Sequence, residues 1–71
     1  MKTEILEKVW NREYTHKASL IQITIEIQHA PKVFYIARST YMDAEGNTAH
    51  NDYDFESEEA ARTLFNALKD L

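Results

Sequence analysis

The sequence predicts an α+β fold in which a four-stranded antiparallel meander sheet packs on one C-terminal helix, in the order ββββα. Three observations support this: isoleucines alternate with mostly polar residues over 20–28, a turn-like segment occupies 43–47, and an apolar stripe at helical spacing follows Ser57. The chain has 71 residues, which leaves room for a single domain, 1–71, and no second one.

The first fourteen residues fit two patterns. Ile5, Leu6, Val9 and Trp10 suit one face of a helix, whereas Leu6, Trp10 and Tyr14 share one side of a strand. Because Val, Trp and Tyr favour strands, we expect a strand here, with a helix over 3–14 as the alternative. The chain then turns back over 14–18 into the isoleucine strand.

The middle of the chain predicts two hairpins. Pro31 lacks a backbone donor, so we expect the isoleucine strand to break over 28–32 and the next strand to run from Val33 to Met42. Gly46 supplies the positive φ that the loop over 43–47 requires. The fourth strand is then expected over 48–55.

The C-terminal segment predicts a helix over 58–70. Ser57 is a suitable N-cap, and the acidic residues that follow it favour the positive end of the helix dipole. The apolar stripe comprises Ala60, Ala61, Leu64, Phe65, Leu68 and Leu71.

The expected register divides the sheet into two sides. With Ile27 opposite Val33 and Tyr41 opposite Ala49, the side that packs on the helix carries Ile23, Ile25, Tyr35, Ala37, Tyr53 and Phe55. The same register pairs Arg38 with Asp52. The opposite side then carries Leu6, Lys8, Trp10, Arg12, Tyr14, Leu20, Phe34, Ile36, Arg38 and Met42. Since one helix cannot cover both sides, we expect a partner-binding or dimer-binding surface there, formed by Trp10, Tyr14, Phe34, Ile36, Arg38 and Met42.

Charge is unevenly distributed along the chain. Residues 1–42 hold six Lys/Arg and four Asp/Glu, whereas residues 43–71 hold two Lys/Arg and eight Asp/Glu. Seven of those carboxylates lie within 43–59, where no Lys or Arg occurs. This predicts an acidic, partner-binding end made of Asp43, Glu45, Asp52, Asp54 and Glu56 together with Tyr41.

Several kinds of chemistry find little support in the sequence. Cysteine is absent, which excludes disulfides and thiolate metal sites, and the three histidines are scattered in the sequence and expected to be exposed. Asp52, Asp54 and Glu56 alternate as possible cation ligands, but a solvated outer face explains them as well. We therefore expect no metal, no cofactor and no enzymatic activity. Without an apolar stretch of membrane-spanning length or a signal-peptide pattern, a cytoplasmic location is expected.

These features favour a non-catalytic interaction module: a small acidic regulator or inhibitor that docks on a basic, nucleic-acid-handling protein. A homodimer is expected as well, because so short a chain without disulfides buries little core. The alternative is single-stranded nucleic-acid binding on the side that carries Trp10, Tyr14, Phe34 and Arg38.

Two resemblances bear on these alternatives. The strand ending in Asp52-Tyr53-Asp54-Phe55, which passes through Glu56-Ser57-Glu58 into an Ala/Leu/Phe helix, resembles a segment of small phage-encoded anti-CRISPR inhibitors. That resemblance implies a non-enzymatic inhibitor that blocks a CRISPR effector's access to nucleic acid. The ββββα order is also similar to that of PUR-repeat and related single-strand-binding proteins, although this chain lacks their dense ridge of Lys and Arg.

Overall fold

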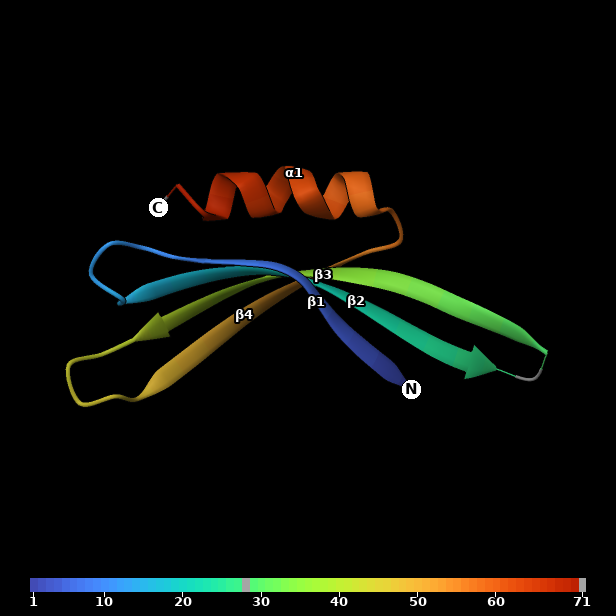
Figure 1. Cartoon of the computed structure of the whole chain (residues 1–71), viewed down its shortest axis with the longest axis horizontal. Helices are drawn as coiled ribbons and strands as arrows, with labels where there is room; N and C mark the ends of the chain where they lie inside the picture. Colours follow the sequence, from blue (N-terminus) through green and yellow to red (C-terminus); the bar gives the residue numbers. More distant parts are fainter. Residues whose placement is uncertain (28, 71) are drawn as a thin grey trace.

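The computed structural model describes residues 1–27 and 29–70 and confirms the ββββα order. The elements are β1 (Lys2–Trp10), β2 (His16–Ile27), β3 (Ala30–Met42), β4 (Thr48–Phe55) and α1 (Glu58–Leu68). The strands form one antiparallel sheet in the order β1-β2-β3-β4 (Figure 1). The edge strands β1 and β4 cross in this view, so the sheet is strongly twisted.

The N-terminal segment is a strand, as expected, and not a helix. It ends at Trp10, so Tyr14 lies in the β1–β2 connection, where its φ of 58° is in the left-handed region. The register of β1 against β2 shifts between Ile5 and Glu7, which marks a β-bulge. Because of the bulge, Leu6 packs against the core beneath the helix and not on the opposite side, where we expected it.

The β2–β3 register differs from the expected one by three residues. Ile27 pairs with Ala30 and not with Val33, and Pro31 lies within β3 opposite Glu26. The expected strand break over 28–32 is therefore too long: β3 begins at Ala30, and residue 28 lies outside the described residues. Since three is odd, the shift exchanges the two sides of β2 relative to β3.

The consequence is that the isoleucines of β2 lie on the side of the sheet away from the helix. Ile21 pairs with Ile36, and Ile23 pairs with Phe34. Leu20, which we expected on that side, pairs with Ala37 in the core instead. We call the following residues the isoleucine face: Ile5, Ile21, Ile23, Ile25, Ile27, Phe34 and Ile36.

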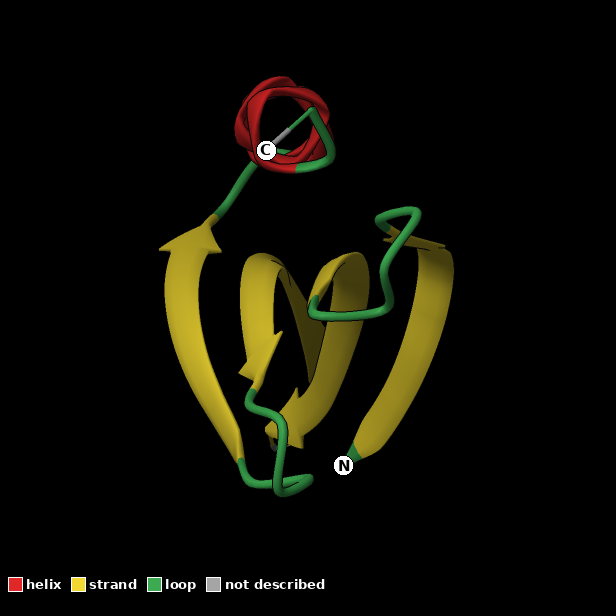
Figure 2. Cartoon of the chain, turned by 90° about the vertical axis from the view of Figure 1, so that its left-hand side faces the viewer, coloured by secondary structure: helices red, strands yellow, loops and turns green. Residues whose placement is uncertain are grey.

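The helix begins and packs as predicted. The Ser57 side chain accepts a hydrogen bond from the backbone N–H of Ala60, and the helix ends at Leu68, two residues before the expected end. The helix lies over one face of the sheet (Figure 2). Phe65 is fully buried and packs with Leu20 and Ala37 of the sheet, so it anchors the helix. The core that it completes consists of Ala18, Leu20, Ala37, Ala61 and Phe65, with Leu6, Val9, Tyr35, Phe55, Leu64 and Leu68 packed around it.

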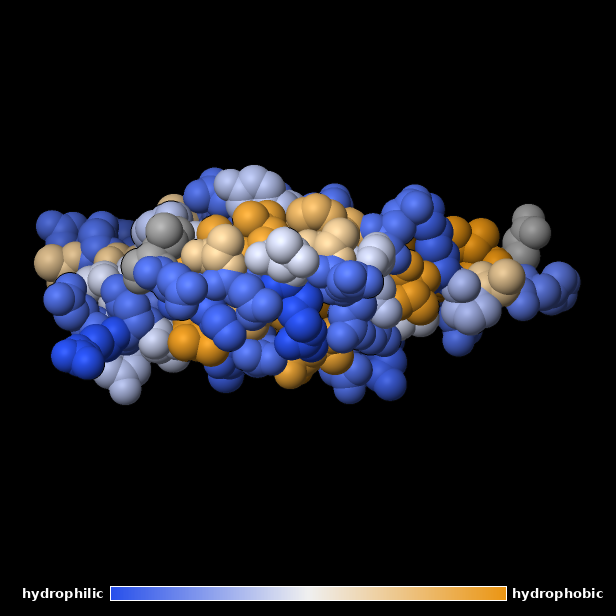
Figure 3. Space-filling view, turned by 90° about the horizontal axis from the view of Figure 1, so that it is seen from above, coloured by the Kyte–Doolittle hydropathy of each residue, from blue (hydrophilic) through white to orange (hydrophobic). Residues whose placement is uncertain are grey.

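The β2–β3 hairpin extends beyond the rest of the sheet. β1 pairs with β2 only as far as Thr24, and β4 pairs with β3 only as far as Tyr35. Residues 25–27 and 30–34 therefore form an arm, two-stranded over 25–27 and 30–32, which we call the hairpin arm. It projects past the N-terminal end of the helix (Figure 1), and hydrophobic side chains reach the surface in that part of the molecule (Figure 3).

Candidate interaction surfaces

The first part of the acidic end is the loop between β3 and β4. The Asp43 carboxylate accepts hydrogen bonds from the backbone N–H groups of Glu45 and Asn47, each at 2.9 Å, and from the Asn47 amide at 3.2 Å. These bonds, the one from the Asn47 backbone above all, lower the pKa of Asp43. Gly46 has φ +87°, as the loop prediction required. Asp43 thus closes the turn, whereas the exposed Glu45 makes no ion pair within residues 1–27 and 29–70.

The second part is β4, where one carboxylate is paired and the next is not. Arg38 donates to Asp52 from Nε at 2.7 Å and from the terminal nitrogen at 2.9 Å, as the predicted β3–β4 register requires. This two-fold hydrogen bond lowers the pKa of Asp52. Asp54, two residues further on, lies opposite Ile36 and is exposed.

The third part is the start of the helix. Arg62 donates to Glu7 of β1 at 3.0 Å and to Glu58 at 3.3 Å, which joins the helix to the first strand. Of the carboxylates within 43–59, four are exposed and take part in no ion pair or side-chain hydrogen bond in the described part of the chain. We call these four the acidic edge: Glu45, Asp54, Glu56 and Glu59.

Tyr41 is separated from the acidic strand side. It pairs with His16 and Ala49, and its ring lies 4.8 Å from the His16 ring. Because side chains alternate along a strand, Tyr41 lies on the helix side, whereas Asp52 and Asp54 lie on the other. The structure therefore does not bring Tyr41 together with those two carboxylates.

His16 itself is buried, which corrects our expectation of exposed histidines. Its Nε2 lies 2.8 Å from the hydroxyl of Ser39, which is also buried, so each group satisfies the other. His50 is exposed on the opposite side, 2.8 Å from the Thr40 hydroxyl. Sequence reasoning missed the His16–Ser39 contact because it placed His16 in a turn and not in a strand.

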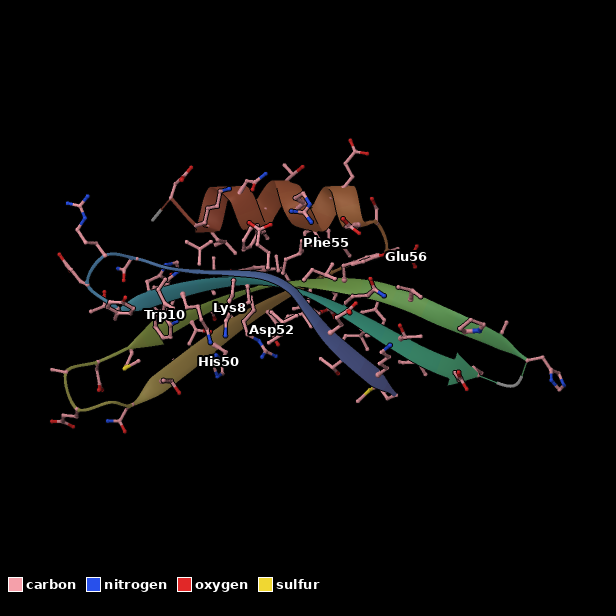
Figure 4. The ribbon with its side chains drawn as sticks, in the orientation of Figure 1. Lys8, Trp10, His50, Asp52, Phe55 and Glu56 are labelled. Carbon is pink, nitrogen blue, oxygen red and sulfur yellow. The ribbon has the colours of Figure 1, made fainter. Side chains whose placement is uncertain are left out.

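A second surface lies on the side of the sheet away from the helix, near the end of β1. Trp10 and Lys8 point to that side, as do His50 and Asp52 of β4 (Figure 4). Lys17, the strand partner of Trp10, places its ammonium 5.1 Å from the centre of the indole ring. Tyr14 lies 5.8 Å from the same ring, although it comes from the connection and not from the strand.

The four β3 residues expected on this side lie there, whereas Arg12 lies in the β1–β2 connection. Phe34, Ile36 and Met42 alternate with the helix-side residues of β3 and are half-buried, as is Trp10, so they are not sealed inside the protomer. Arg38 is also there, but its charge is compensated by Asp52. Sequence reasoning missed Lys17. The available signal was its spacing: it follows Trp10 by seven residues, across the short connection between β1 and β2, and therefore pairs with it.

A groove runs along the hairpin arm at the border between the isoleucine face and the acidic edge. Its volume is about 350 Å³. The lining residues are Ile25, Ile27, Lys32, Phe34, Asp54, Phe55 and Glu56. An apolar floor with charges of both signs at its rim is suited to contact with a macromolecule.

The structure also bears on two kinds of site. No helix in the part of the chain that the structure describes is long and apolar enough to cross a membrane. Over residues 1–27 and 29–70, no cluster of three His, Asp or Glu side chains is arranged to hold a metal ion. Comparison with protein-family models, with curated proteins and with solved structures gives no match to this chain.

Proposed function

We propose that this protein is a non-catalytic interaction module whose acidic edge docks on the basic surface of a nucleic-acid-handling protein. The observation that carries the proposal is the set of four exposed carboxylates, Glu45, Asp54, Glu56 and Glu59, that no described basic side chain pairs. An inhibitor of the anti-CRISPR kind is one protein of this class.

The distribution of ion pairs supports this role. Both arginines near the acidic edge are already engaged, Arg38 by Asp52 and Arg62 by Glu7 and Glu58. The acidic edge therefore keeps its negative charge, which is stabilised when an opposite charge approaches. A basic surface of a partner supplies that charge and is attracted over a distance set by the salt concentration.

The geometry of β4 suits a surface that normally binds a phosphate backbone. Asp52 and Asp54 follow each other on one side of the strand, so they are about 6.7 Å apart along it. Glu56 follows immediately after the strand, nearer the start of the helix (Figure 4). Since Arg38 engages Asp52, Asp54 and Glu56 are the carboxylates of this segment that offer free anionic oxygens, as a phosphate backbone does.

The experiment is capture of partners from nuclease-treated extract by the immobilised protein. We expect the captured proteins to be nucleic-acid-binding ones, to elute as salt rises and to be displaced by added single-stranded oligonucleotide. Replacing Glu45, Asp54 and Glu56 by Lys together should abolish capture. These three leave Asp43 and Asp52, which hold the turn and the β3–β4 pair, unchanged.

The matched control replaces three exposed glutamates elsewhere, Glu4, Glu13 and Glu26, by Lys. This variant has the same net charge as the first, so a loss of capture by both would mean that only total charge matters. Unchanged capture by the acidic-edge variant would contradict the proposal.

A second candidate is single-stranded nucleic-acid binding by Trp10, Tyr14, Lys8 and Lys17. The observation that favours it is the contact of the Lys17 ammonium and the Tyr14 ring with a half-buried indole, since a base stacks on such a ring beside a cation. Oligonucleotide binding at low salt should quench Trp10 fluorescence, and Lys17→Ala should weaken the binding. No quenching at low salt would eliminate this candidate.

A further inference from the structure

The protomer has more surface than a closed domain of its mass. It exposes 5169 Å² at 8.3 kDa, whereas folded monomers of that mass expose about 4,600 Å². Its Cα radius of gyration is 13.4 Å, compared with about 11 Å for a compact domain of the same length. The extents of 46 × 24 × 15 Å show that the molecule is elongated.

The core inside this elongated protomer is small. Six hydrophobic residues are buried among those described, and three of them are alanines: Ala18, Leu20, Ile21, Ala37, Ala61 and Phe65. Small domains of this kind usually gain stability from disulfides, metals or association. Cysteine is absent, so disulfides do not contribute.

The isoleucine face is left uncovered at its two ends, whereas Ile21 in its middle is buried. Ile5 is 56% exposed and Ile27 is 53% exposed, at two ends of this face. Ile25 and Ile27 belong to the part of the hairpin arm that has only two strands. An isolated two-stranded ribbon is marginally stable in water, so the arm requires something packed against it.

We propose that the isoleucine face packs against the same face of a second copy of this chain, related by a twofold axis. The excess surface of about 600 Å² is of the order that each partner of a stable complex buries, about 800 Å². Twofold dimers are the commonest assemblies of identical chains.

The charges around the groove favour a second copy over a basic or an acidic protein. Lys32 comes from β3, whereas Asp54 and Glu56 come from the end of β4 and the residue after it. A twofold axis parallel to the groove sets Lys32 of one copy opposite Asp54 and Glu56 of the other, whereas a basic partner meets Lys32 and an acidic partner meets the two carboxylates. The face is therefore complementary to itself in charge as well as in hydrophobicity.

Pairing through strand edges fits the structure less well. β1 is interrupted by the bulge at Leu6, and antiparallel pairing of two β4 strands sets Asp52 and Asp54 of each copy close to like charges. The free segment of β3 contains Pro31, which has no N–H to donate. Contact between faces avoids all three problems.

The experiment measures the mass of the purified protein by sedimentation equilibrium over a range of micromolar concentrations. We expect twice the 8.3 kDa of one chain, with dissociation on dilution. Ile5→Glu and Ile27→Glu each place a carboxylate in the contact twice, so each should raise the dissociation constant by more than about tenfold. Both residues are exposed in the protomer, so circular dichroism should show an unchanged fold.

The control is Val33→Glu. Val33 belongs to the same hairpin arm and is 37% exposed, but it pairs with Thr24 and lies on the helix side. The dissociation constant of the Val33→Glu dimer should equal that of the wild-type dimer. A wild-type mass of one chain at every concentration would overturn the proposal, even if the face bound a different protein from extract. It would also be overturned if Val33→Glu raised the dissociation constant as much as Ile5→Glu and Ile27→Glu. Asp54 and Glu56 belong both to the groove and to the acidic edge, but all acidic residues are unchanged in these variants, so this mass measurement and the capture experiment test the two proposals separately.

Discussion

The pairing of Arg38 with Asp52 shows how a single residue links sequence, structure and pH dependence. The hydrogen bonds from Arg38 lower the pKa of Asp52 and raise that of Arg38. An aspartate whose pKa is lowered in the native state stabilises that state above its unfolded pKa of about 3.9, and the stabilisation is lost as pH falls through the native pKa. Because both side chains are about one-third exposed, solvent and salt keep this contribution below about 1 kcal/mol.

Asp52→Asn should therefore lower the free energy of unfolding at neutral pH by up to about 1 kcal/mol, and the difference from the wild type should disappear near about pH 2. Urea unfolding at several pH values measures this. Asp54→Asn, on the same side of the same strand but without an ion pair in the described residues, is the control and should cost less at neutral pH. A difference that persists in acid would show that Asp52 stabilises by something other than its charge.

Other residues were not predictable in this way, since their roles depend on burial. The ion pair between Arg38 and Asp52 follows from strand register alone, and the turn role of Gly46 follows from the loop pattern around it. The contact between His16 and Ser39, by contrast, requires β2 to begin at His16, four residues before the alternating isoleucine segment. Local patterns do not show that extension, because Lys17 and Ala18 do not have strong strand propensity.

At the scale of elements, the helix was the most predictable and the β2–β3 hairpin the least. Alternation shows which residues of a strand share a side, but it does not show which side meets the helix. Pro31 indicated a break because proline has no backbone N–H to donate. The pairing of β3 with β4 ends at Tyr35, however, so no β4 strand lies beside Pro31 to require that hydrogen bond. The odd shift that follows moved four isoleucines from the expected core to the opposite side.

The helix N-terminus gives a test at this scale. Ser57→Ala removes the acceptor for the Ala60 N–H, so we expect a loss of about 1 kcal/mol in the free energy of unfolding, measured by urea titration. Ser57→Asp keeps an acceptor at the N-cap and should retain most of the stability. If alanine and aspartate had equal effects, the hydrogen bond would not be the source of the cap's stability.

At the scale of the whole molecule, the sequence predicted the charge distribution. It predicted the residues on the uncovered side of the sheet only in part. The acidic edge follows from counts along the chain, although ion pairing removes Asp52 and Glu58 from it, and hydrogen bonding within the turn engages Asp43. The expected second side contained Trp10, Phe34 and Ile36 correctly and omitted the isoleucines of β2. Their inclusion makes that side more apolar than we expected, which increases the drive for association.

The proposed dimer couples folding to concentration, and thermal unfolding measures that coupling. Because association stabilises the folded chain by mass action, the midpoint Tm should rise as protein concentration rises. Ile27→Glu should lower Tm at high concentration and make it independent of concentration, whereas Val33→Glu should keep the dependence. The contrast is informative because Ile27 and Val33 lie on opposite sides of one hairpin arm, so a general loss of strand stability affects both alike. A wild-type Tm that does not change with concentration would mean that the small core and the helix alone stabilise this elongated protomer.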